Sequence, residues 1–209
     1  MKIKCNTPSC PCQNLPSHLN SPEDRFIYTD EERKFIWMNI PKCASTSLCA
    51  TLFPPPRNHQ QGSKLAAKFA SAFFKFAFVR NPYDRAVSNY AMFTQNQMRI
   101  NQLDSYKLPG LNPQDLSFRE FLTMTSQLDN HHWNPQINFL PFEPDFIGRL
   151  ENLQEDLDNI YKQINIPKQQ LPHTNKTNHK HYREHYNDHT IKMVQEIYKD
   201  DLQKFNYNF

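Results

Sequence analysis

The chain has 209 residues, which suits one domain with short extensions, and its net charge of only +3 argues against a general nucleic-acid-binding protein. Aromatic residues make up 13% of the chain, so a dense core can form. With only three glycines, the chain contains neither the Gly-rich fingerprint of dinucleotide-binding proteins nor that of P-loop triphosphatases.

No apolar run is long enough to span a membrane, and the first twenty residues lack the apolar block of a signal peptide. These features favour a cytoplasmic location, although a chain trimmed of a membrane anchor and working in the Golgi lumen would look the same. Five cysteines occur, and Cys5, Cys10 and Cys12 crowd the N-terminal tail. Those three could bind a metal, but a flexible, reduced tail is favoured, and we predict no metal site.

The order of expected elements predicts the fold class. Residues 1–33 are polar and broken by prolines, so we expect an irregular lead-in there and a single domain over 34–209. Short apolar runs predict strands at 34–40, 73–79 and 146–150. Helical periodicity and capping residues predict helices at 45–53, 63–72, 81–93, 117–128, 151–164 and 188–205. Strands that alternate with helices indicate an α/β fold with a central parallel sheet flanked by helices on both sides.

The segment IPKCASTSL, residues 40–48, follows the first expected strand and opens a helix. A helix N-terminus offers N–H groups and the positive end of the helix dipole, and a hydroxyl residue is expected to cap it. Small residues let the backbone approach an oxyanion, and the lysine adds a positive charge. The segment predicts a phosphate- or sulfate-binding loop made of Lys42, Cys43, Ala44, Ser45, Thr46 and Ser47. The alternative is a capped helix beside a lysine, with no ligand.

A second candidate anion site follows the second expected strand, in the segment FVRNPYDRAVSNY. Arg80 stands at the end of a buried strand, where an unpaired charge is costly, so it needs a carboxylate or a bound anion. Ser88 lies about two turns into the following helix, and arginine and serine together can hold a terminal phosphate. The alternative is an internal ion pair between Arg80 and Asp84, with Arg85 exposed to solvent.

Together these segments resemble the paired motifs of sulfotransferases that use 3′-phosphoadenosine-5′-phosphosulfate (PAPS). IPKCASTSL looks like the 5′-phosphosulfate loop, and FKFAFVRNPYDRAVSNY looks like the 3′-phosphate motif. FIGRLENLQEDL and the stretch from Leu171 onward resemble the third strand with its helix and the closing segment of that family. The resemblance covers Phe35 to Phe209. Within that family, the chain resembles the carbohydrate branch that includes heparan sulfate 2-O- and chondroitin/dermatan sulfotransferases.

The resemblance implies a P-loop-like three-layer fold and sulfuryl transfer from PAPS to a hydroxyl of a carbohydrate or glycan acceptor. It implies that residues 42–47 hold the 5′-phosphosulfate, with Lys42 neutralising the leaving phosphate, and that Arg80 and Ser88 hold the 3′-phosphate. An in-line displacement of this kind relies on positioning and charge stabilisation and requires no metal. Ala44 departs from the glycine of many relatives. The lead-in also lacks the anchor of the animal Golgi enzymes, which makes the resemblance to small soluble microbial members closer.

A histidine is expected to take the proton of the acceptor hydroxyl, because its ordinary pKa lies near neutrality. His59 is the first candidate, since it lies between the two cofactor motifs, where relatives place a base histidine; the alternative is an exposed loop histidine. His132, in a segment that resembles the family's HWxPQ string, is the second candidate, and a structural role is the alternative. Glu120 and Asp129 are outside candidates.

A basic segment before the last helix includes Lys176, Thr177, His179, Lys180 and Arg183. It could close over the nucleotide, grip an acidic glycan, or form a solvated surface. Two other functions compete with sulfuryl transfer. A P-loop kinase would need a late lysine and glycines that this loop lacks. A protein of the same fold could also bind nucleotide or glycan without turnover.

Overall fold

The computed structural model describes residues 3–4, 26–53, 60–61, 63–96, 100, 112–171 and 181–209. The chain forms two compact units. The first, here called the sheet unit, comprises Ser17–Arg80 and Gln136–Lys176. The second, the helical unit, comprises Met1–Pro16, Asn81–Pro135 and Thr177–Phe209.

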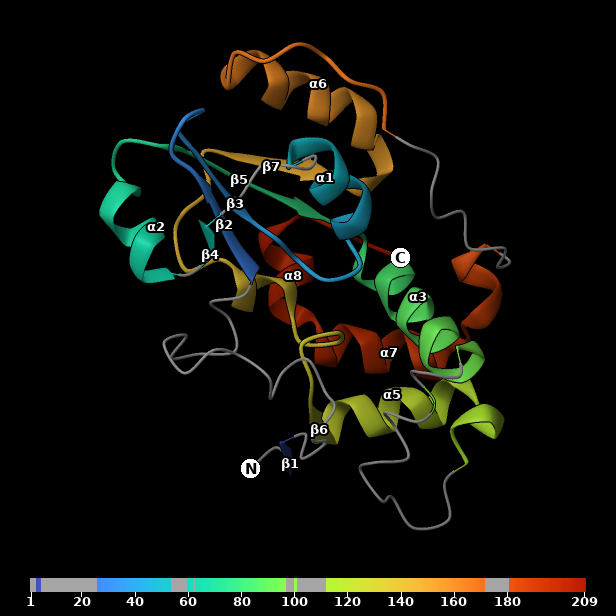
Figure 1. Cartoon of the computed structure of the whole chain (residues 1–209). Helices are drawn as coiled ribbons and strands as arrows, with labels where there is room; N and C mark the ends of the chain where they lie inside the picture. The colour runs from blue at the N-terminus through green and yellow to red at the C-terminus, as the bar shows by residue number, and fades with distance from the viewer. Residues whose placement is uncertain are drawn as a thin grey trace. The chain divides into compact units, whose positions relative to one another are not determined.

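A five-stranded sheet with the order β4-β2-β3-β5-β7 forms the centre of the sheet unit (Figure 1). Strands β3 (Phe35–Met38), β5 (Phe74–Val79) and β7 (Phe146–Arg149) are parallel neighbours. All four residues of β3 are buried, because a central parallel strand is covered on both faces. The predicted α/β fold with a mostly parallel central sheet and flanking helices is confirmed.

Strand β2 (Ile27–Asp30) corrects the expectation of an irregular lead-in over these residues. It pairs antiparallel with β3, and β4 (Gln60–Gln61) pairs antiparallel with β2. Ile27 and Thr29 are buried, but an alternation this short gives a weak strand signal in the sequence. The hairpin turn is held by Asp30, whose Oδ1 accepts the backbone N–H of Arg33 at 2.8 Å.

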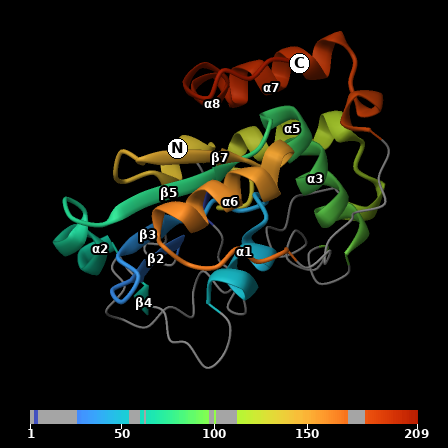
Figure 2. The same cartoon turned by 90° about the horizontal axis from the view of Figure 1, so that it is seen from above.

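The described residues of the sheet unit form the α-helices α1 (Ser45–Leu52), α2 (Ser63–Phe69) and α6 (Leu153–Gln163). Helix α6 runs alongside β7 and follows it through the short 3-10 helix η4 (Leu150–Asn152) (Figure 2). Leu48 and Leu52 on α1 are buried, and so is Phe53, which caps the helix C-terminus. Gly148 on β7 lies against Phe78, where an added Cβ would meet a ring carbon at 2.5 Å, so only glycine fits there.

The helical unit contains α3 (Pro82–Gln95), α5 (Phe118–Gln127), α7 (Asp188–Ile197) and α8 (Lys199–Lys204). It also contains the short helices η2 (Pro113–Asp115) and η5 (Tyr182–His185) and the strand pair β1 (Ile3–Lys4) with β6 (Leu128–Asp129). Asn81 caps α3 by accepting the N–H of Tyr83 at 3.0 Å, and Pro82 takes the first helical position, where proline is favoured. Within the described ranges, no helix is long and apolar enough to cross a membrane.

The single final helix predicted over 188–205 is wrong in one respect, because the chain breaks it at Tyr198 into α7 and α8. Tyr198 has φ −116° and ψ 28°, outside the helical region. Its buried hydroxyl donates to the carbonyl of Trp133 at 2.8 Å, and burial raises its pKa to about 12. This anchoring contact is long-range, so the local helical pattern contains no sign of it.

Candidate anion-binding site

The loop between β3 and α1 has an uncommon backbone. Lys42 has φ 72° and Ala44 has φ 62°, both in the left-handed region, whereas Cys43 between them has a negative φ. Left-handed and right-handed residues in succession can turn neighbouring backbone N–H groups toward one side and form a concavity for an anion. In this loop the Cys43 N–H itself donates to the Ile40 carbonyl at 3.2 Å. The first helical bond runs from the Leu48 N–H to the Ala44 carbonyl at 3.0 Å. The N–H groups of the first turn lie before this bond, where an α-helix provides no carbonyl of its own for them.

Ala44, rather than a hydroxyl residue, is the N-cap of α1, and its side chain makes no capping bond. The prediction of a hydroxyl cap is wrong because the chain enters the helix through a left-handed residue. Ser45 is the first helical residue, and its hydroxyl lies 2.6 Å from Oδ1 of Asn39 and 3.2 Å from the Ile40 carbonyl. An L-residue in the left-handed region costs about 1–2 kcal/mol, so these surrounding contacts must hold the loop in place.

Arg80 follows β5 and reaches the same loop. It is 9% exposed, and its Nη1 donates to the carbonyl of Lys42 at 3.4 Å. Since β3 and β5 are parallel neighbours, their carboxyl ends meet at one edge of the sheet, where ligands bind in open α/β folds. The structure thus brings the predicted loop and Arg80 together, with two cationic residues beside a helix N-terminus.

Gln136, at the start of η3 (Gln136–Phe139), belongs to this site, although sequence alone does not point to it. It is fully buried, and its Nε2 donates to the Arg80 carbonyl at 2.9 Å. Its Oε1 accepts the Arg80 N–H at 2.9 Å and lies 3.3 Å from Sγ of Cys43. Only its place in the HHWNPQ string could have suggested a role, because 56 residues separate it from Arg80.

Ser88 lies on α3 in the helical unit and is 3% exposed. Arg85 on the same helix is only 1% exposed, so the alternative in which Arg85 is exposed to solvent is wrong on that point. Its guanidinium donates to the carbonyls of Asn134 at 2.9 Å and His132 at 3.0 Å. The side chain of Asn89 donates to the same His132 carbonyl at 2.9 Å. Arg85 therefore has a structural role, because it holds the backbone of the HHWNPQ segment against α3.

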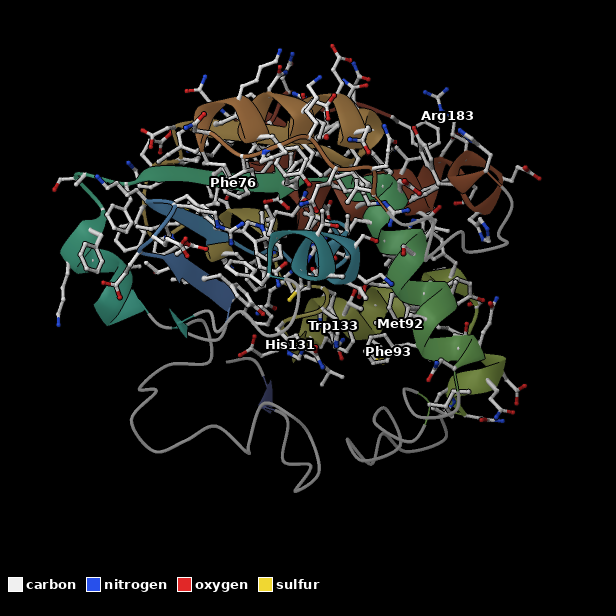
Figure 3. The ribbon with its side chains drawn as sticks, turned by 45° about the horizontal axis from the view of Figure 1, so that its top comes forward. Phe76, Met92, Phe93, His131, Trp133 and Arg183 are labelled. Atoms are coloured by element: carbon white, nitrogen blue, oxygen red, sulfur yellow. The ribbon has the colours of Figure 1, made fainter. Side chains whose placement is uncertain are left out.

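His132 is buried in the helical unit. The centroid of its ring lies 5.4 Å from that of Phe93. Phe93 in turn lies beside Trp133 (Figure 3), and the centroids of these two rings are 5.2 Å apart. The Trp133 indole N–H donates to the Leu128 carbonyl at 3.0 Å, and the His132 N–H donates to Oδ1 of Asn130 at 2.9 Å. These contacts build the segment into the core of its unit, and a catalytic role for His132 stays a prediction.

Four of the remaining candidates differ in whether the structure describes them. His59, Lys176 and Thr177 lie outside the described residues, so their roles stay predictions. Glu120 forms the capping box of α5, and hydrogen bonds from Ser117 lower its pKa, which makes it a weaker base. Among the residues that the structure describes, no group of three or more His, Cys, Asp or Glu side chains is arranged to hold a metal ion.

Comparisons with known proteins show the family of the chain. A family model described as "Sulfotransferase family" matches residues 55–208. The match includes Arg80, Ser88 and Gln136 but begins after the loop at 40–48, whose assignment depends on its own residues and backbone. An uncharacterized protein of Archaeoglobus fulgidus is 28% identical over 111 residues, which is 51% of this chain and 80% of that protein. No solved structure is significantly similar to the chain.

Proposed function

The chain belongs to the sulfotransferase family, and we propose that it transfers a sulfuryl group from PAPS to a hydroxyl of a carbohydrate acceptor. One observation carries the proposal. The loop with the alternating backbone meets Arg80 at the carboxyl ends of β3 and β5, with Arg80 Nη1 3.4 Å from the Lys42 carbonyl. Two cationic sites on one sheet edge can hold the phosphosulfate and the 3′-phosphate of one nucleotide.

The chemistry assigned to these residues is an in-line displacement at sulfur. The acceptor oxygen forms a bond to sulfur while the bond from sulfur to the 5′-phosphate oxygen breaks, and that oxygen keeps the electron pair. Lys42 offsets the charge that develops on this leaving group, and the N–H groups at the start of α1 bind its oxygens. Arg80 and Ser88 bind the 3′-phosphate.

The acceptor proton goes to a base, and His59 is proposed for this role because of its place between the two cofactor motifs. His132 is the second candidate, although its burial against Phe93 supports a structural role. Lys176 and Thr177 are proposed to close over the nucleotide. Transfer requires the base, whereas nucleotide binding does not, so the two properties can be measured separately.

Transfer of labelled sulfate from PAPS to a panel of carbohydrates tests the proposal. The panel should include heparan, chondroitin and dermatan polymers with free hydroxyls, because the motifs resemble that branch. Label on at least one polymer is the expected result. A protein that binds adenosine 3′,5′-bisphosphate but labels no acceptor would instead be a binding protein of the same fold.

A further inference from the structure

The side-chain amide of Gln136 uses both of its polar atoms inside the sheet unit. Nε2 donates to the Arg80 carbonyl and Oε1 accepts the Arg80 N–H, each at 2.9 Å. The amide therefore pairs with one residue as a neighbouring strand would. Strand β5 ends at Val79, which forms the last pair with β7 through Arg149. The Gln136 amide pairs with the next residue, Arg80.

The second contact of Oε1 reaches the anion loop. Sγ of Cys43 lies 3.3 Å from this oxygen and 3.9 Å from the Pro41 carbonyl. Cys43 is 1% exposed and stands between the two left-handed residues Lys42 and Ala44. The buried Cys43 thiol, which donates to Gln136, therefore fixes the middle of the loop.

The same loop meets Arg80 a second time, through the hydrogen bond from Nη1 of Arg80 to the Lys42 carbonyl. Gln136, Cys43, Lys42 and Arg80 thus form a closed ring of contacts between the ends of two neighbouring strands. Gln136 is the only member of the ring that comes from a third segment and touches both sides.

We infer that Gln136 is a positioning residue that fixes the spacing between the phosphosulfate loop and Arg80 before the nucleotide binds. The inference rests on the proposed function, because it assigns the two sides of the ring to the two ends of one nucleotide. When the two sites are already ordered, the nucleotide spends no binding energy on ordering them. Loss of the Gln136 contacts should therefore weaken the affinity for the nucleotide. Gln136 need not touch the ligand itself.

A purely structural role is the competing explanation, since a buried N–H and C=O left without partners destabilise any protein. The two roles differ in what they change. Loss of stability alone leaves the affinity of the folded molecules intact, whereas loss of positioning lowers it at temperatures where the protein is fully folded.

Calorimetric titration with adenosine 3′,5′-bisphosphate separates these roles. Gln136→Met keeps the side-chain length and removes both polar atoms of the amide, and we expect affinity to fall about tenfold or more, because ligand binding must then order the loop and Arg80. Ile160→Val, a buried change on α6, is the control: it lowers the melting temperature and leaves affinity unchanged. Equal affinity of Gln136→Met and the wild-type protein would overturn the inference.

The contact with Cys43 supplies a second, independent test. Cys43→Ala removes the donor and Cys43→Ser keeps one, so the serine variant should bind the bisphosphate more tightly than the alanine variant. Combining Cys43→Ala with Gln136→Met should weaken binding by less than the product of the single effects. If Gln136→Met does not fold, equal affinity of the two Cys43 variants overturns the inference. A wild-type protein that binds no bisphosphate contradicts the proposed function instead.

Discussion

Replacing Ala44 by glycine tests the backbone on which the anion loop depends. Ala44 has φ 62° and ψ 21°, where an L-residue costs about 1–2 kcal/mol and glycine costs nothing. Glycine also raises the entropy of the unfolded chain, which offsets about 0.4–1 kcal/mol of that gain. We therefore expect Ala44→Gly to raise the free energy of unfolding by about 0.5–1 kcal/mol.

Ala50 provides a matched control on the same helix. It is exposed and lies inside α1, where glycine is less favourable than alanine by about 1 kcal/mol. The identical chemical change should thus have opposite effects at the two positions, which urea unfolding followed by circular dichroism can measure. If Ala44→Gly destabilises the protein as much as Ala50→Gly does, Ala44 is not left-handed and the loop is not the one described here.

Three further predictions concern the nucleotide, the base and the acid stability. Arg80→Ala should weaken the binding of adenosine 3′,5′-bisphosphate by about 10- to 100-fold, because a charge-assisted hydrogen bond is lost; unchanged affinity would remove Arg80 from the 3′-phosphate site. His59→Ala should lower the transfer rate by about 10²–10⁴-fold with cofactor binding nearly intact, and near-wild-type turnover would exclude His59 as the base. Burial raises the pKa of Asp145, but hydrogen bonds from Lys75, whose Nζ lies 2.8 Å from Oδ2, outweigh burial and lower it below its usual value of 3.8. A depressed pKa stabilises the fold above that usual value, and the contribution is lost as the pH falls through the folded pKa. Asp145→Asn should therefore lose less stability between pH 5 and pH 2 than the wild type in acid titrations of the melting temperature, and identical profiles would contradict this.

The elements that local patterns specify were predictable. The continuous apolar runs of β3 and β5 and the capping residues Asn81 and Ser117 each act within a few positions, so the sequence reveals them. Strand β2 was missed because its alternation covers only four residues and its partner lies across a hairpin.

The contact between Arg80 and the loop of Lys42 could be expected from the sequence, whereas the residues that support this loop could not. Arg80 directly follows β5, which ends at Val79, and Lys42 lies in the loop after β3, which ends at Met38, so the rule that ligands bind at strand ends points to both residues. Gln136 and Arg85 act through contacts with backbone atoms 47 to 56 residues away, and such contacts leave no periodic signal. The left-handed conformation of Ala44 is similarly invisible, because alanine normally favours the helix.

Sulfate transfer by the wild-type protein and by Lys42→Ala tests the central claim most directly. With labelled PAPS and the carbohydrate panel, the wild-type protein should produce a labelled acceptor. Lys42→Ala should lose most of that turnover while still binding adenosine 3′,5′-bisphosphate, because Lys42 acts mainly on the charge of the leaving phosphate. Undiminished transfer by Lys42→Ala, or no labelled acceptor from a wild-type protein that binds the bisphosphate, would contradict the account.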